Sequence, residues 1–117
     1  MIRLQLPFPP SVNSLFRDVS RRDGKRAGRI KTQRYLTWIR AATNEAAAQD
    51  QKPIRGHVKV RILLGKPDRR KRDLDNLLKA PLDLLTGLSL IEDDSAVQCI
   101  QVSWAEVDGA LVEVRAA

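Results

Sequence analysis

The segment 58–64 constrains the fold most, because its side chains alternate between apolar and cationic. One set is apolar and shares one face of an extended chain: Val58, Val60, Ile62 and Leu64. Lys59 and Arg61 fall on the other face. A period of two residues is that of a β-strand, since successive side chains of a strand point to opposite sides of the sheet. We therefore expect a strand that buries its apolar face and leaves its cationic face in solvent.

Two further elements precede this strand. Apolar residues alternate with polar ones over 2–6, which predicts a strand that ends at Pro7, because proline has no N–H for a sheet ladder. Apolar side chains between Tyr35 and Ala46 recur on one helical face of an alanine-rich stretch. This pattern predicts a long helix that stops before Pro53.

A second helix is expected after the strand. Leucines spaced three and four residues apart predict it over residues 73–85, with Asp73 as its N-cap and Gly87 just beyond its end. Pro81 interrupts the pattern. An interior proline costs a helix about 3 kcal/mol, so we expect a kink or a fresh start of the helix there.

The last part of the chain is expected to form a β-hairpin. Residues 96–104 and 110–115 predict two strands joined at Asp108-Gly109, a pair that readily adopts the positive φ angles of a tight turn. The apolar phase slips between Cys99 and Ile100, which indicates a bulge or burial on both faces.

The composition fits a single domain over residues 1–117. With 43% hydrophobic residues the chain can bury one core, in the element order β-α-β-α-β-β, as an α/β (α+β) protein with a small mixed sheet and two helices. A small chain gains stability by burying more surface in an oligomer, so we expect a homodimer. The lone Cys99 permits no intramolecular disulfide, and the first ten residues carry neither a signal peptide nor a membrane span. We expect a cytoplasmic protein with no membrane partner.

Positive charge is concentrated in one segment. The net charge is +7, and residues 17–34 hold eight Lys or Arg against two Asp. With Gly24 and Gly28, the segment of about 17–31 is predicted to be a flexible basic loop that closes over phosphates, with an affinity that falls as salt rises. The candidate DNA contacts in this loop are Arg17, Arg21, Arg22, Lys25, Arg26 and Arg29.

A second cationic run leads directly into carboxylates. KPDRRKRD at residues 66–73 continues as DLDNLLK at 73–79, and EDD follows at 92–94. Cations attract a polyanion, whereas carboxylates repel it unless a divalent cation lies between them. The run therefore favours a nuclease over a protein that only holds nucleic acid. Its candidate DNA contacts are Arg69, Arg70, Lys71 and Arg72.

The acidic residues can converge. Asp73 and Asp75 lie at an extended-to-helix junction, where both can reach one Mg²⁺, and Asp94 can supply a third carboxylate. Asp75 and Lys79 are four residues apart and would share a helical face, so the ammonium would lie beside a metal-bound phosphate. The alternatives are an exposed ion pair and solvated acids. Residues Glu92 and Asp93 rival Asp94 as ligands.

Three segments resemble the RusA family of Holliday junction resolvases. They are LPFPPSVNSLFR at 6–17, DRRKRDLDNLLKAPLDLL at 68–85 and IEDDSAV at 91–97. The resemblance implies an active enzyme that uses Mg²⁺, for which Mn²⁺ can substitute. It assigns catalysis to four residues: Asp73, Asp75, Lys79 and Asp94. Pro81 and Ala96 depart from the family pattern, which affects the helix geometry and a minor polar contact.

The function predicted from these features is structure-selective cleavage of four-way (Holliday) DNA junctions. A metal-bound water would attack the phosphodiester while Lys79 steadies the reacting phosphate. A twofold dimer would place one acidic site against each of the two strands that must be nicked. The alternatives are a non-catalytic basic DNA- or RNA-binding protein and a metal-dependent nuclease without junction preference.

Other conspicuous residues have simpler interpretations. We expect His57 at the surface, with Cys99 and Trp38 in the core. Phe8 and Phe16 flank a proline-rich turn, where packing is common, yet an exposed aromatic there could wedge between bases at a junction centre. Phe16 is the better candidate for such a wedge.

Overall fold

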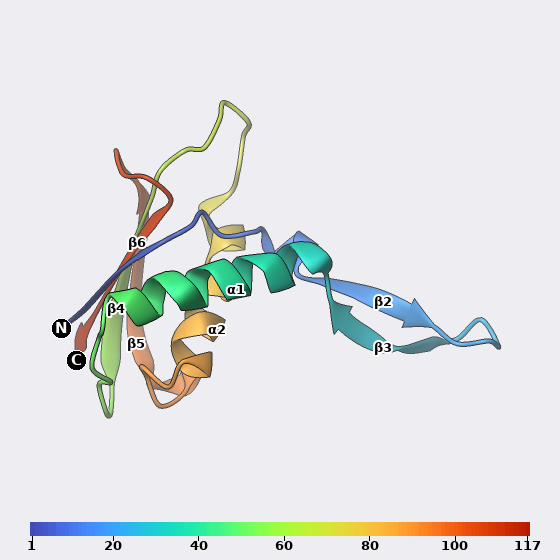
Figure 1. Ribbon diagram of the computed structural model, residues 1–117, viewed down its shortest axis with the longest axis horizontal. Coiled ribbons are helices and arrows are strands. Elements are labelled where there is room, and N and C mark those ends of the chain that lie inside the picture. The colour runs from blue at the N-terminus through green and yellow to red at the C-terminus, as the bar shows by residue number, and fades with distance from the viewer.

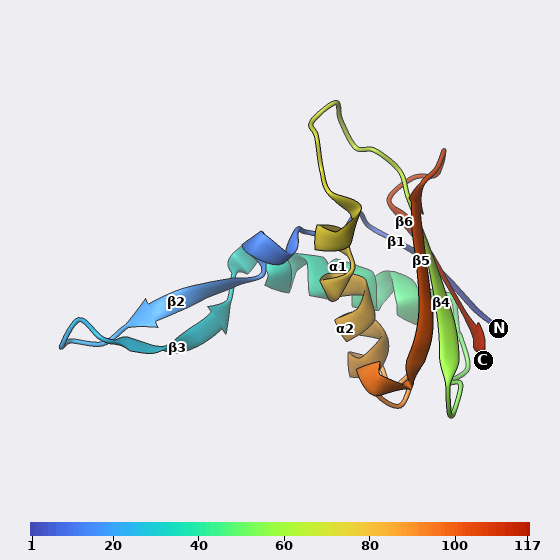
Figure 2. The ribbon, with the colours of Figure 1, turned by 180° about the vertical axis from the view of Figure 1, so that it is seen from behind.

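The main sheet has four strands in the order β1-β6-β4-β5. The computed structural model describes residues 1–117, apart from the side chain of Arg26, so the DNA contact predicted for Arg26 lies outside the described residues. The strands are β1 (Ile2–Leu6), β4 (Val58–Leu64), β5 (Val97–Trp104) and β6 (Ala110–Ala116). Helices α1 (Gln33–Ala48) and α2 (Lys79–Gly87) cover one face of the sheet, as Figures 1 and 2 show. The mixed sheet and two helices confirm the predicted fold class.

The core lies between this sheet and the helices. The apolar residues of β1 and β4 that were predicted to face inward are all buried, and their neighbours along each strand are mostly exposed. Trp38 from α1 is 6% exposed and donates its indole N–H to the Pro7 carbonyl at 3.1 Å. Each large apolar side chain buried in this way contributes about 1.5–3 kcal/mol. Periodicity therefore located β1, α1 and β4 correctly.

The predicted hairpin of the last two strands is wrong. Strand β4 lies between β5 and β6, parallel to β5 and antiparallel to β6. The segment from β4 to β5 contains α2, and a helical crossover of this kind brings the two strands into parallel pairing. The connection 105–109 then crosses the end of β4, where Gly65 N–H donates to the Gly109 carbonyl at 2.9 Å. Gly109 has the positive φ expected of a tight turn, but it lies in the connection that crosses β4 and not in a hairpin turn.

The irregularity expected in β5 is present at a different residue. Val58 pairs with Val97 and Lys59 with Cys99, which leaves Gln98 as the extra residue of a bulge. Cys99 is exposed, so its assignment to the core is wrong. Ile100 is 41% exposed, because β5 is an edge strand whose outer face no helix covers. His57 is exposed as predicted.

The crossing at Gly65 leaves no space for a side chain. A Cβ at Gly65 would lie 1.7 Å from the Val107 carbonyl oxygen. Gly65→Ala should therefore lower the free energy of unfolding by about 3 kcal/mol or more, because the loop must move off the sheet. Urea denaturation measures this loss. Gly87→Ala is the matched control, since a Cβ there meets nothing within 4 Å; an equal loss in both variants would contradict the close crossing.

The segment predicted as a flexible basic loop is instead a β-ribbon. Strands β2 (Phe16–Ser20) and β3 (Arg26–Lys31) pair antiparallel and form a second sheet. The turn is closed by Arg21 N–H, which donates to the Lys25 carbonyl at 2.7 Å. Figure 1 shows the ribbon projecting away from the main sheet. These strands could not be predicted from the sequence, because neither face of the ribbon is buried and no apolar alternation marks it.

The predicted second helix is divided in two. A 3-10 turn, η2 (Leu74–Leu77), precedes α2, which begins at Lys79 and ends at Gly87 as expected. Pro81 lies in the first turn of α2, where a missing N–H leaves no helical bond unmade. This is the fresh start that its position suggested. Asp73 occupies the N-cap position of η2, but its side chain makes no capping hydrogen bond.

Two short 3-10 turns complete the chain, η1 (Val12–Ser14) and η3 (Asp94–Ala96). Within the part of the chain that the structure describes, no helix is long and apolar enough to cross a membrane.

Candidate active site

Two carboxylates stand free beside the cationic loop. Asp73 and Asp75 are exposed, and neither side chain has a hydrogen bond or ion pair with any side chain that the structure describes. The cations of the loop at residues 66–72 precede them directly. Carboxylates without a partner beside so many cations keep their oxygens available, and such oxygens are the ligands that hard divalent cations prefer.

The exposed ion pair of Lys79 with Asp75, one of the alternatives left by the sequence, is not formed, because Lys79 pairs with Asp83. Lys79 Nζ lies 3.2 Å from both carboxylate oxygens of Asp83, one turn further along α2. The backbone changes from a 3-10 turn to an α-helix between Asp75 and Lys79. The two residues therefore lack the regular four-residue helical spacing that the prediction assumed. The ammonium remains about half exposed and can leave Asp83 at little cost, because an exposed ion pair contributes about 0.3–0.5 kcal/mol.

Asp94 is held at the other end of α2. Thr86, in the last turn of this helix, donates its hydroxyl to Asp94 Oδ1 at 2.7 Å. The neighbouring Asp93 accepts from the Ser95 hydroxyl at 2.6 Å and from the Ser95 N–H at 3.2 Å, which caps η3. These bonds, the hydroxyl first, hold the pKa of Asp93 below its usual range. Asp93 therefore caps this turn through Oδ2, and Glu92 and Asp94 are the other acids of the turn.

The three predicted aspartates do not converge in the single chain. Figure 2 shows η2 at one end of α2 and the start of β5 leading away from the other. With a rise of 1.5 Å per residue, Lys79 and Thr86 are about 10 Å apart along the helix. Among the described residues, no three His, Cys, Asp or Glu side chains are close enough together to hold one metal ion. The donor pair Asp73 and Asp75 still fits Mg²⁺, which is commonly bound by one or two carboxylates with substrate phosphates and water.

Hydrogen bonds within the cationic loop hold its conformation. Arg72 donates to both oxygens of Asp68, at 2.6 and 3.0 Å, and the Arg70 N–H donates to the same carboxylate at 2.9 Å. The Arg72 hydrogen bonds, followed by that of Arg70, hold the pKa of Asp68 well below its usual range. Arg72 is therefore engaged in shaping the loop, whereas the Arg70 side chain is 82% exposed and Arg69 and Lys71 are exposed beside it.

A groove of about 590 Å³ runs from this loop towards the base of the ribbon. Its lining includes Asp73, Asn76, Ser11, Ser14 and Arg34. Arg34, in the first turn of α1, was not among the predicted DNA contacts. Its place in a charged segment was visible in the sequence, but its place in one groove with Asp73 depends on how α1 packs. A groove lined by both Arg34 and Asp73 suits a phosphate that a divalent cation links to the carboxylate.

Phe16 is occupied by contacts within the protein. Its half-buried ring packs edge-on against Tyr35, with centroids 5.9 Å apart, and the Arg29 guanidinium lies 4.5 Å from its centroid. Burial, and then the nearby Asp83, raise the pKa of Tyr35. Phe16 and Arg29 therefore stabilise the base of the ribbon. The exposed cations that the structure describes on the ribbon outside this cluster are Arg17, Arg21, Arg22, Lys25 and Lys31.

A small basic α+β domain with free carboxylates beside exposed cations has the groups that a nucleic-acid-processing enzyme uses. The sequence model of the family described as Endodeoxyribonuclease RusA matches residues 7–115. The chain belongs to the RusA endodeoxyribonuclease family.

Three relatives illustrate the similarity. The crossover junction endodeoxyribonuclease of Enterobacteria phage HK97 is 33% identical over 99 residues, which is 83% of this chain and 77% of the relative. That of Escherichia coli strain K12 is 35% identical over 94 residues, covering 80% of this chain and 74% of the relative. A third, from Enterobacteria phage 82, is 55% identical over 40 residues, covering 34% and 33%.

Proposed function

We propose that this chain is a divalent-metal-dependent endodeoxyribonuclease that resolves Holliday junctions. The observation that carries the proposal is the free pair Asp73 and Asp75 at the end of the cationic loop, in a member of the RusA family. A protein that only bound DNA would gain nothing from unpaired carboxylates next to its phosphate contacts, because they repel phosphate.

Asp73 and Asp75 are the residues proposed to hold Mg²⁺, for which Mn²⁺ can substitute. When bound, the ion supplies a Lewis acid and lowers the pKa of a water molecule. Lys79 leaves Asp83 and offsets the charge that develops on the reacting phosphate. Asp94 is proposed as the third catalytic carboxylate, with Thr86 orienting it in the free protein.

Cations from two elements are proposed to bind DNA along the groove. Arg69, Arg70 and Lys71 contact the backbone from the loop, and Arg34 contacts it from α1. The cations of the ribbon reach a second part of the same duplex, since the molecule extends 50 Å along its longest axis. A two-stranded ribbon also has the width that the major groove of DNA admits. These contacts position the protein without reading bases.

Two copies of the chain act together in this proposal. A four-way junction has approximate twofold symmetry and must be nicked on two strands, so a closed homodimer places one site against each. The enzyme works in the cytoplasm, where it meets branched DNA.

Metal dependence and assembly can be measured together. Sedimentation velocity should show a dimer, and cleavage of a junction should stop on chelation and return with Mg²⁺ or Mn²⁺. A protein that cuts equally well in chelator, or that stays monomeric while it nicks both strands at once, would contradict the proposal.

A further inference from the structure

Trp104 at the end of β5 lies in a stack of aromatic rings and cations. Its indole is nearly parallel to the Phe8 ring, with an interplanar angle of 5° and centroids 6.3 Å apart. The Lys66 ammonium lies 5.5 Å from the Trp104 centroid, and the Arg72 guanidinium lies 5.5 Å from that of Phe8. The indole is half-buried, and its N–H has no hydrogen-bond partner in the described part of the chain. A large ring thus stands partly at the surface, in contact with Phe8 and with an exposed lysine.

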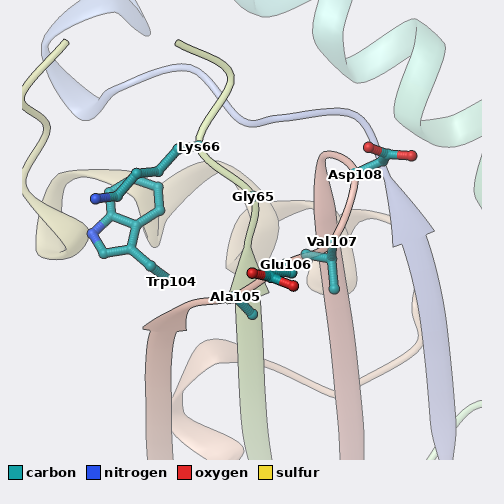
Figure 3. Close-up of a pocket in the computed structure, with 7 residues that line it drawn as sticks. All are labelled: Gly65, Lys66, Trp104, Ala105, Glu106, Val107 and Asp108. Carbon is teal, nitrogen blue, oxygen red and sulfur yellow. The ribbon is translucent and has the colours of Figure 1, made fainter. Parts of the chain in front are cut away.

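This ring belongs to the same cavity as the candidate active site. A cavity of about 580 Å³ is lined by Trp104, by Asp73 and by the cations of the loop. A second cavity, of about 620 Å³, is also lined by the indole, together with Lys66 and the loop 105–108. Figure 3 shows Lys66 beside Trp104 at one edge of this second cavity, with Glu106 and Asp108 on the loop away from them.

The charges around Trp104 orient a nucleotide. Glu106 and Asp108 repel phosphate, whereas Lys66 and the loop that follows it attract phosphate. A strand whose backbone follows the loop past Asp73 therefore presents its bases towards the indole. The Lys66 side chain is exposed and flexible, so it can move from the ring to a phosphate when a base replaces it.

We propose that Trp104 is a stacking site for an unpaired nucleobase next to the cleaved phosphate. The proposal rests on the proposed function, since the strand that Asp73 and Asp75 engage is the strand that reaches Trp104. Nucleotides at the branch point of a junction are easier to unstack than those within a duplex, and an aromatic platform captures any base because every base has a π-face. Trp104 would then help to select branched DNA, a role that the sequence had suggested for Phe16.

The test measures base stacking under conditions in which the DNA is not cleaved. Binding is measured without metal in the Asp75→Asn protein, using a four-way junction and a single-stranded oligonucleotide, each carrying 2-aminopurine at one position at a time. Trp104→Leu keeps apolar bulk but removes the π-face, and Trp104→Phe keeps a ring. Unfolding midpoints of both variants show whether the packing on Phe8 survives.

The parent protein is expected to quench 2-aminopurine in the single strand and at one position beside the branch point. Trp104→Leu should lose this quenching and bind both DNAs about 5- to 150-fold more weakly, while Trp104→Phe should keep most of the affinity. Unchanged quenching in Trp104→Leu, or equal losses in the two variants at equal stability, would overturn the proposal. The single-stranded arm tests stacking even if the parent protein shows no junction preference, so the two proposals can fail separately.

Discussion

Asp75→Asn is expected to reduce cleavage of a four-way junction by more than about 100-fold while leaving junction binding intact or stronger. Residues that only support a metal ligand are worth 10- to 100-fold, so loss of a ligand itself should exceed this range. Binding should not weaken, because removing a carboxylate charge lowers the repulsion of phosphate. Single-turnover cleavage in Mg²⁺ and electrophoretic binding in chelator measure the two effects separately.

Asp83→Asn is the matched control for this substitution. It removes the same charge from the same region, but Asp83 pairs with Lys79 and is not a proposed ligand. It should retain cleavage within a few fold. Equal losses in Asp75→Asn and Asp83→Asn would contradict the assignment of Asp75.

The substitution Asp94→Asn tests whether Asp94 takes part in the reaction as the third carboxylate. If Asp94 reaches the metal in the DNA complex, the substitution should act like Asp75→Asn on cleavage, and Thr86→Val should act weakly, because the hydroxyl only orients the carboxylate in the free protein. Retained cleavage in Asp94→Asn would limit the site to the pair at η2.

Removal of three cations from the tip of the ribbon is expected to weaken binding to every DNA shape. A variant with Arg21, Arg22 and Lys25 changed to Ala should show a slope of log affinity against log salt that is smaller by about 2.7 if each cation contacts one phosphate, since each contact contributes about 0.9. Fluorescence anisotropy over a series of salt concentrations, with linear duplex and junction, measures the slope.

The loss must come from the ribbon and not from net charge. A control variant with Lys52, Arg55 and Arg115 changed to Ala loses the same charge from exposed positions around the start of β4, at the end of that strand opposite the active-site loop. Its slope should be nearly unchanged. If the two variants behave alike, the ribbon does not contact DNA.

Elements with one buried face could be predicted from the sequence. Val58 to Leu64 and the helix around Trp38 carry a period because their apolar sides must face the core. The ribbon escaped prediction because it buries neither face, so its sequence shows only charge and glycine. The pairing of β5 with β4 also escaped, because Asp108-Gly109 suggests a local turn and strand partners are decided by packing across the whole sheet.

The candidate site was predictable as a set of residues and not as a geometry. The run of cations that leads directly into Asp73 and Asp75 marked these two residues in the sequence. The hydrogen bond from Thr86 to Asp94 and the pairing of Lys79 with Asp83 depend on where α2 begins, which Pro81 signalled only as one of two alternatives. Trp104 gave no signal of its own, because its neighbours Phe8 and Lys66 come from distant parts of the chain.

Cleavage of a synthetic four-way junction compared with linear duplex of the same sequence, in the presence of Mg²⁺, tests the proposed function most directly. The proposed function predicts paired nicks on two strands of the junction, little cutting of the duplex, and no cutting of either DNA by the Asp75→Asn protein. Equal cutting of both DNAs would indicate a nuclease without junction preference. Tight binding of the junction with no Mg²⁺-dependent cleavage would contradict the proposed enzymatic activity and would indicate a non-catalytic DNA-binding protein.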